Sequence, residues 1–339
     1  MDDDWKQQLD RLHAVMVERD DPAAWVAEAD AIDASLRYPH LAVRGPVFGV
    51  AAQDSRVDPH WRLLIEVGDG TPQQARDALH SYLWFKAKDE AGSRGERRAL
   101  LAAVAVLERE RADELEVLGV RYRVVRGDQF ARSAEDGLEP PRPTDREPAD
   151  LSWDMGQLPA SPDIGYVLDP AYTDTGPAVA ALRLGLAPFA YAGARFPDDV
   201  REDSERAVTT HPGIVLLPVG FGVTEHYDKG WRPRGSLMPT PHEARRTLYL
   251  GMTDIWLRLR QIEDHEREVY AAAAEEFRAA GRANEVLVGE ARFRICRIER
   301  LMRTGPDGPE PPRPSDRDAY EPMKMHPTMD EDGNLDYDD

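Results

Sequence analysis

The chain has 339 residues, 41% of them apolar, which is enough to bury a core and excludes a disordered chain. Its 43 basic and 63 acidic residues give a net charge of −20, which argues against direct nucleic-acid binding and against an anionic membrane surface. The single cysteine, Cys296, excludes a disulfide framework and a cysteine-rich metal centre.

The two ends of the chain hold most of the excess negative charge. Residues 1–36 have a net charge of −7 and residues 319–339 one of −6. We expect N-terminal helices over 1–37 and a solvated acidic tail over 319–339. The acidic start is unlike a signal peptide, and the longest apolar run, Ala99 to Leu107, is too short to cross a bilayer. These features predict a cytoplasmic protein without a membrane anchor.

The segment 38–147 predicts a mixed unit of strands and helices. Thr71-Pro72 indicates a helix start, because a threonine hydroxyl caps a helix and proline favours its first position. The predicted order is a strand over 47–52, a strand over 63–67, a helix over 71–88, a helix over 97–116, a strand over 121–126 and a proline-rich tail.

This unit has a match later in the chain. Residues 121–147 and 292–318 align at an offset of 171, with 13 of 27 positions identical, among them the run Glu-Pro-Pro-Arg-Pro. Two shorter matches lie upstream: 71–76 with 240–245, and, more weakly, 63–68 with 215–220. The matches predict a tandem duplication. Its expected divisions are N-terminal helices over 1–37, unit one over 38–147, a Pro-rich linker with a short helix over 148–185, unit two over 186–318 and a tail over 319–339.

The second unit is expected to repeat the first. It has a predicted strand over 213–219, helices within 240–281 and a strand over 291–298. Strand–strand–helix–helix–strand in each unit predicts an α+β fold, internally duplicated, with a small and mainly antiparallel sheet in each unit.

Several segments resemble a known family. RYPHLAVRGPVFGVA (37–51), EPPRPTD and EPPRPSDRD are similar to a family of actinobacterial, in particular streptomycete, proteins described only as a domain of unknown function. The resemblance covers the whole chain. It implies a bacterial cytoplasmic setting and brings no activity, cofactor or catalytic residue.

The proline-rich repeats hold the first candidate binding residues. Arg142 and Arg313 lie in extended polyproline segments, each followed three residues later by an aspartate, Asp145 or Asp316. One interpretation is a binding element that presents an arginine to a partner. The interpretation that we favour is a strap that packs on its own unit or on the other one.

Arginine pairs on the last predicted strand of each unit form a second candidate. Strand alternation places Arg121 and Arg123 on one face and Arg292 and Arg294 on the matching face. Arginine forks suit a phosphate or carboxylate, so an anion site is one interpretation. Ion pairs with neighbouring glutamates on a solvated sheet face are the more common alternative.

The segment 221–239 is expected to be an insertion found in the second unit alone. It contains Trp231, a possible ligand contact, and His226 and Asp228, weak candidates for proton transfer. The adjacent Glu225 completes a set of metal-ligand types, but the spacing matches no established metal motif, and we expect no metal or cofactor. A long surface hairpin is the simpler interpretation.

No catalytic motif occurs in the sequence, so the chain is not expected to be an enzyme. Our leading prediction is a binding or scaffolding component that acts through a protein partner or through homo-oligomers. The alternative is a small-molecule binder or enzyme with an anion site between the two units or under 221–239. Mimicry of nucleic acid by the acidic surface is the third hypothesis.

Overall fold

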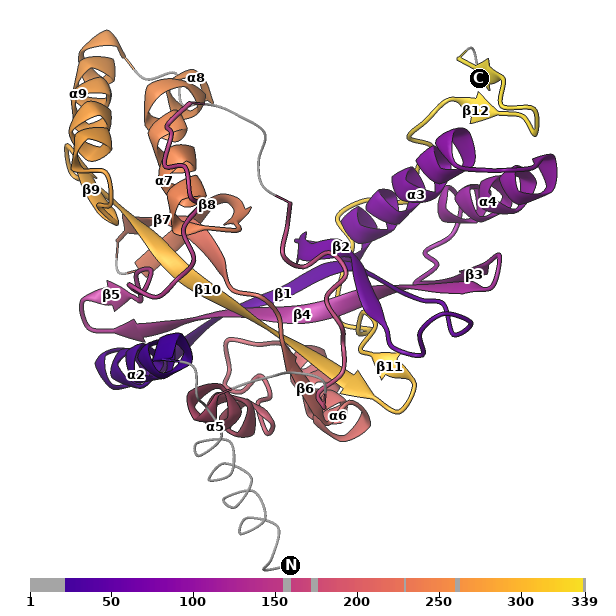
Figure 1. Ribbon diagram of the computed structural model, residues 1–339, viewed down its shortest axis with the longest axis horizontal. Coiled ribbons are helices and arrows are strands. Elements are labelled where there is room, and N and C mark those ends of the chain that lie inside the picture. Colours follow the sequence, from indigo (N-terminus) through magenta and orange to yellow (C-terminus); the bar gives the residue numbers. More distant parts are fainter. Residues whose placement is uncertain (1–21, 155–159, 172–175, 229, 260–262, 338–339) are drawn as a thin grey trace, which may run out of the picture.

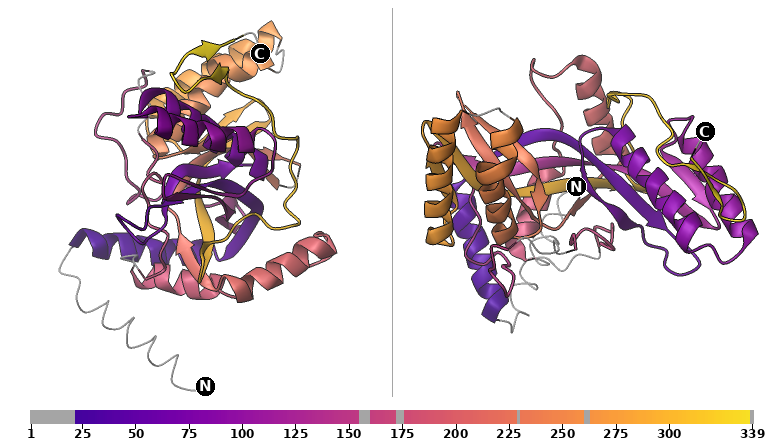
Figure 2. Two further views of the ribbon diagram at one scale, coloured as in Figure 1. Left: turned by 90° about the vertical axis from the view of Figure 1, so that its right-hand side faces the viewer. Right: turned by 90° about the horizontal axis from the view of Figure 1, so that it is seen from above.

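A large antiparallel sheet joins two helical arms (Figure 1). The computed structural model describes residues 22–154, 160–171, 176–228, 230–259 and 263–337. In this part of the chain, eleven strands form the sheet, with the central order β2-β1-β4-β10-β7-β8. Seen from above, the long strands run from one arm to the other (Figure 2, right). The α+β class is confirmed, and the described parts of both units share one sheet.

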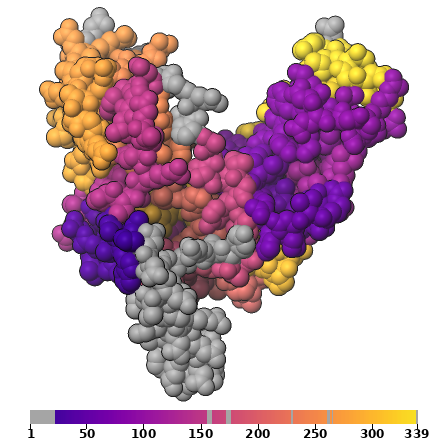
Figure 3. All heavy atoms as spheres, viewed as in Figure 1, coloured from indigo at the N-terminus to yellow at the C-terminus, as the bar shows by residue number. Residues whose placement is uncertain are grey.

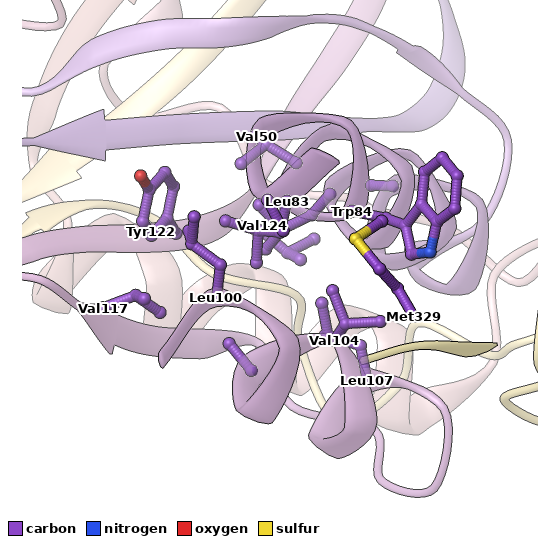
Figure 4. Close-up of a cluster of buried hydrophobic side chains, with 14 of the residues drawn as sticks. Val50, Leu83, Trp84, Leu100, Val104, Leu107, Val117, Tyr122, Val124 and Met329 are labelled. Atoms are coloured by element: carbon purple, nitrogen blue, oxygen red, sulfur yellow. The ribbon is translucent and has the colours of Figure 1, made fainter. Parts of the chain in front are cut away.

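The first half of the molecule follows the expected order. Its elements are β1 (His40–Gln53), β2 (Arg62–Asp69), α3 (Pro72–Asp89), α4 (Arg94–Leu107), β3 (Glu114–Val117), β4 (Val120–Ala134) and β5 (Gly137–Leu138). Thr71 caps α3 in a complete capping box with Gln74. Helices α3 and α4 bury Leu83, Leu100 and Val104 against the sheet in an apolar cluster (Figure 4).

One predicted helix is too long. The apolar spacing predicted a helix over 97–116, but α4 ends at Leu107 and Glu114–Val117 form strand β3. Leu115 pairs with Tyr122 of β4 in the sheet. The side chain of Asp113 accepts hydrogen bonds from Arg76 of α3. Pairing with β4 therefore outweighs helix propensity in this segment.

The second half repeats the element types. Its elements are α6 (Asp198–Thr210), β6 (Gly213–Leu216), β7 (Gly220–Tyr227), β8 (Gly230–Met238), α7 (Pro241–Leu250), the π-helical turn η1 (Gly251–Ile255), α8 (Trp256–Leu259), α9 (Asp264–Ala280), β9 (Glu285–Val288), β10 (Ala291–Gly305) and β11 (Gly308–Pro309). Thr240 caps α7 as Thr71 caps α3. Helices α7 and α9 cover the sheet in the second arm (Figure 1).

The segment 221–239 differs from the expected insertion. It forms the hairpin β7–β8, whose first strand pairs with β10 as β1 pairs with β4. Phe48-Gly49-Val50 of β1 and Phe221-Gly222-Val223 of β7 face positions 171 residues apart on their partner strands. Strand β6 pairs with residues 301–304 of β10, and the start of β1 pairs with residues 130–133 of β4, which are the same positions at the offset of 171. The weak match of 63–68 with 215–220 was therefore wrong, because β6 and β7 together take the place of β1.

The two proline-rich segments cross over between the halves. We call 139–147 strap one and 310–318 strap two. Asp145 of strap one accepts a hydrogen bond from Arg297 of β10, whereas Asp316 of strap two accepts one from Arg126 of β4. The backbone nitrogens of Arg297 and Arg126 also bond to carbonyls of these straps, at Glu139 and Glu310. Each strap thus packs on the opposite half.

The strap ends reach the first turns of the helices in the opposite arms. Glu147 accepts hydrogen bonds from the side chain of Arg245, at 2.6 Å, and from the backbone nitrogen of His242. Asp318 does the same for Arg76, at 2.8 Å, and for the backbone nitrogen of Gln73. A carboxylate at a helix N-terminus also complements the helix dipole. These contacts fix each arm to the strap of the other half.

The remaining segments pack outside this frame. Helices α2 (Pro22–Arg37) and α5 (Pro177–Leu186) lie beneath the sheet, on the side away from the arms (Figures 1 and 2). The acidic tail is ordered over 319–337 and contains β12 (Thr328–Met329) and β13 (Leu335–Asp336). Met329 enters the core of the first arm (Figure 4). No described helix has the length and apolar composition needed to span a membrane.

Candidate functional site

A cleft of about 740 Å³ lies between the two arms, above the central strands (Figure 3). Its floor is made by β4 and β10, one wall by the end of β2 and the start of α3, and the other wall by the β7–β8 hairpin. Both halves of the chain therefore contribute to it. The polar residues that line it include Arg44, Glu66, Asp69, Gln129, His226 and Arg300.

Arg300 is the best-anchored polar residue of the floor. It is buried and pairs with Asp163, which is 0% exposed. Its Nη atoms also donate to the carbonyls of Val67, at 3.0 Å, and Pro218, at 2.7 Å. Its Nε is buried and has no acceptor among the described residues. Arg300 thereby links the two walls of the cleft, because Val67 belongs to β2 and Pro218 precedes β7.

The wall formed by β2 is acidic. Glu66 and Asp69 line the cleft near Gly68 and Gly70, whose missing side chains leave the backbone open to it. Burial, with the negative charges of Glu66 and Asp77, raises the pKa of Asp69 to about 6. A carboxyl group that titrates near neutral pH in a cleft is typical of a binding or catalytic site. At pH 7 this wall attracts a cation or a hydrogen-bond donor.

The opposite wall carries two of the residues that the sequence suggested. His226 and Trp231 are paired across the β7–β8 hairpin and make an edge-to-face contact, with ring centroids 5.1 Å apart. Both line the cleft. Asp228 lies at the exposed hairpin tip with a φ of 48°. No described contact joins it to His226, so the structure does not assemble the expected proton-transfer pair.

The arginine pairs are engaged within the protein. Arg121 and Arg123 both bond to Glu114 and stack on Trp61. Arg123 Nη1 also donates to the carbonyl of Pro309 in β11. The expected anion site on this strand is therefore occupied by the protein's own groups.

The second pair repeats this arrangement on the other half. Arg292 and Arg294 bond to Glu285 and stack on Trp231. Arg294 Nη1 donates to the carbonyl of Leu138 in β5 at 3.0 Å. Trp231 thus faces the cleft while it supports this ion-pair cluster.

The strap arginines also have partners in the chain. Arg142 Nε donates to Glu139 at 2.6 Å, and Arg313 bonds to Glu310 through both Nε and Nη2. The backbone nitrogen of each arginine donates to the aspartate three residues later. These bonds fix the turn of each strap, and Arg313 is buried.

Glu225 and the single cysteine are also engaged within the protein. Glu225 forms an ion pair with Arg234 rather than a ligand set with His226. The described residues contain no group of three or more His, Cys, Asp or Glu placed to hold a metal ion. Burial raises the pKa of the Cys296 thiol to about 12, so it stays protonated beside Thr224.

The sequence did not single out the acidic wall or the floor. Asp69 lies in Gly68-Asp69-Gly70, which reads as an ordinary turn. Gln129 and Arg300 lie at matching positions of the 171-residue offset, in the middle of a stretch, 127–131 against 298–302, that has no identical position. That difference within a matched segment was the available signal for the floor.

A family model matches residues 21–319, and its description is "Family of unknown function (DUF5954)". The chain belongs to this family. The resemblance seen in the sequence to a domain of unknown function is thus confirmed. No curated protein and no solved structure matches the chain.

Proposed function

We propose that this member of the family binds a small molecule in the cleft between its arms. The observation that carries the proposal is the cleft of about 740 Å³ with polar groups from both halves around it. This volume is in the range of small-molecule sites, and such sites occur preferentially between repeated or separate domains.

The charges around the cleft favour a ligand with a cationic or hydrogen-bond-donating group. Glu66, Asp69 and Glu135 line it, whereas the charge of Arg300 is compensated by Asp163. Arg44 also lines it and donates to Gln129 at 3.3 Å. We therefore place the positive end of the ligand against Glu66 and Asp69. The expected anionic ligand suits this cleft less well.

We also propose that the two halves are a tandem duplicate, which explains why the cleft lies where it does. Gln129 pairs with Arg300 at the centre of the β4–β10 ladder, and the two residues are themselves 171 positions apart. The strap contacts recur at the same offset in both directions. The cleft lies over this centre, where the two copies have diverged in sequence.

Native mass spectrometry of the protein purified gently from its own cells tests the proposal. A bound mass that is lost on denaturation is expected from the wild type. Ser236→Trp should abolish it, because Ser236 is exposed and lines the cleft. Glu116→Trp, at an exposed position of β3, is the matched control and should retain it. A bound mass that persists in Ser236→Trp would contradict the proposal.

Protein partners remain a prediction. The straps lend it no support, because Arg142 and Arg313 are already paired within the chain. A larger complex in the same mass spectrum, unchanged by Ser236→Trp, would favour scaffolding over ligand binding.

A further inference from the structure

A second pocket lies on the underside of the sheet, opposite the cleft. Its volume is about 220 Å³. Alternation along the strands separates the two sites: Ile298 and Arg300 of β10 line the cleft, whereas Arg297 and Glu299 line the second pocket. Helix α5 closes it from below, with Ala178, Val179 and Leu182 in its wall.

This pocket concentrates positive charge in an acidic protein. Four arginines line it, from β4, strap one, α5 and β10: Arg132, Arg142, Arg183 and Arg297. Among the described residues, Glu299 is the one carboxylate in the lining, and it pairs with Arg297. Behind the lining, Glu139 pairs with Arg142 and Asp145 with Arg297. Within the described part of the chain, these carboxylates pair with Arg142 and Arg297, and none of them pairs with Arg132.

Arg132 is the arginine of this pocket that lacks a partner among the described residues. Its guanidinium has no hydrogen bond or ion pair with any described residue, and its Nε is buried without an acceptor. Leaving a buried donor unsatisfied is costly, so such a group in a folded protein calls for a partner. An anion in the pocket would supply both the missing acceptor and the missing negative charge.

The other half of the molecule shows what such an arginine does when it is a structural residue. Arg303 lies 171 positions after Arg132. Arg303 pairs with Ile214 of β6, and Arg132 pairs with Leu41 at the corresponding place in β1. The Nε of Arg303 is buried without an acceptor, as is that of Arg132, but Arg303 Nη2 donates to the carbonyls of Ala187, at 3.2 Å, and Phe189, at 2.7 Å. Arg132 has no such acceptors among the described residues.

We propose that the pocket lined by Arg132, Arg142, Arg183 and Arg297 binds the phosphate group of a small phosphate monoester or inorganic phosphate. Several arginine forks around one space suit a tetrahedral oxoanion. The apolar wall formed by α5 and by Leu216 and Leu217 suits the carbon portion of a monoester. The site is independent of the proposed cleft ligand, because it lies on the other face of the sheet.

The test measures binding of inorganic phosphate and glycerol phosphate to the full chain by calorimetry and by thermal shift, with sodium chloride at matched ionic strength as the blank. Arg132→Gln should weaken phosphate binding at least tenfold, and Arg132→Lys should restore part of it. Arg44→Gln, which alters the cleft and not this pocket, should bind phosphate as the wild type does. Tighter binding of glycerol phosphate than of phosphate would identify a monoester as the ligand, and the reverse would identify the free ion.

The same variants also define the results that would overturn the proposal. Since Arg132 bonds to no described residue, Arg132→Gln should melt within about two degrees of the wild type without phosphate. No phosphate-specific shift in the wild type, or equal phosphate binding by wild type and Arg132→Gln, would overturn the proposal. A large loss of stability in Arg132→Gln without phosphate would overturn it too, because the guanidinium would then serve a partner within the chain.

Discussion

At the scale of single residues, the most informative group is the carboxyl of Asp69. It lies half-buried beside Glu66 at the acidic wall of the cleft, and burial raises its pKa to about 6 from an ordinary 3.8. Because the folded-state pKa lies above the unfolded one, Asp69 contributes stability that is fully present below about pH 4. That contribution is lost as the pH rises through about 6. The protein therefore tolerates an unfavourable charge at neutral pH, as is common where a group serves binding.

Asp69→Asn should raise the melting temperature at pH 7.5 by a few degrees and change it little at pH 4.5. An amide resembles the protonated acid, so the variant avoids the charge that destabilises the wild type at neutral pH. The measurement is thermal unfolding by circular dichroism at both pH values. Glu116→Gln, an exposed carboxyl on β3, is the control and should show no such difference between the two pH values. Equal shifts at both pH values would mean that Asp69 has an ordinary pKa.

Asp69→Asn should also weaken the binding of the cleft ligand if that ligand is cationic. The same physical change would then raise stability and lower affinity, which a merely structural residue would not do. Affinity in the wild type should fall as the pH is lowered through about 6, since the carboxylate becomes neutral. Calorimetry with the ligand identified by mass spectrometry measures this directly. An affinity that rises on acidification would instead indicate an anionic ligand.

At the scale of elements, the sequence predicted the helix starts, because these depend on local signals. Thr71-Pro72 correctly predicted the start of α3, and the match at Thr240-Pro241 predicted the start of α7. The end of α4 was wrong because the pairing of Leu115 with Tyr122 is a long-range contact. Local patterns do not contain such contacts.

A hairpin over 221–239 was among the predictions, but its pairing with β10 was missed for a different reason. The weak match was between 63–68 and 215–220, whereas the informative match is Phe48-Gly49-Val50 with Phe221-Gly222-Val223, at an offset of 173. The cleft and the strap exchange depend on how the halves pair, so neither could be derived from the pattern of one unit.

The straps are the elements whose contacts can be weakened one at a time. Asp316→Ala removes a carboxylate that pairs with the buried Arg126, and we expect a loss of about 3 kcal/mol in the free energy of unfolding. Asp307→Ala removes an exposed partner of Arg123, 76% accessible, and should cost less than about 1 kcal/mol. Urea unfolding of both variants compares them. Similar losses in the two would show that strap two does not bury its charges as described.

At the scale of the whole molecule, each half depends on the other for its satisfied charges. Arg126 pairs with Asp316 and Arg297 with Asp145, so a half that is expressed alone keeps only the ion pair within its own strand, with Asp128 or with Glu299. The two halves also share the β4–β10 ladder. The protein should therefore unfold as one cooperative unit although its sequence consists of two similar parts.

Fragments test this dependence. Residues 22–147 alone should lack a cooperative thermal transition, and mixing them with residues 148–337, which include the partner of Arg300, should restore both the transition and the compact size. Circular dichroism and size-exclusion chromatography measure these properties. A cooperative transition in the first fragment alone, at the temperature of the full chain, would refute the mutual dependence.

The tail makes a separate contribution to the first arm. His326 stacks on Trp84 with ring centroids 4.6 Å apart, and Met329 is buried in the same core. A chain that ends at residue 322 should therefore be less stable by about 2 to 4 kcal/mol, which is typical of losing a large apolar side chain from a core. Its Trp84 emission should shift to longer wavelength as water reaches the ring. Met329→Ala in the full chain should give the same direction of change with a smaller shift, and unaltered emission in the shortened chain would contradict the packing.

The exchange of straps also sets an order of events during synthesis. The partners Arg126 and Asp316 are 190 residues apart in the chain. At about 5 to 20 residues per second, a ribosome needs about 10 to 40 seconds to travel that distance. Throughout this interval Arg126 has Asp128 as an ion-pair partner but not Asp316, and the edge of β4 that pairs with β10 is open. The first half can therefore complete its buried charge pairs only after the last proline-rich segment has emerged.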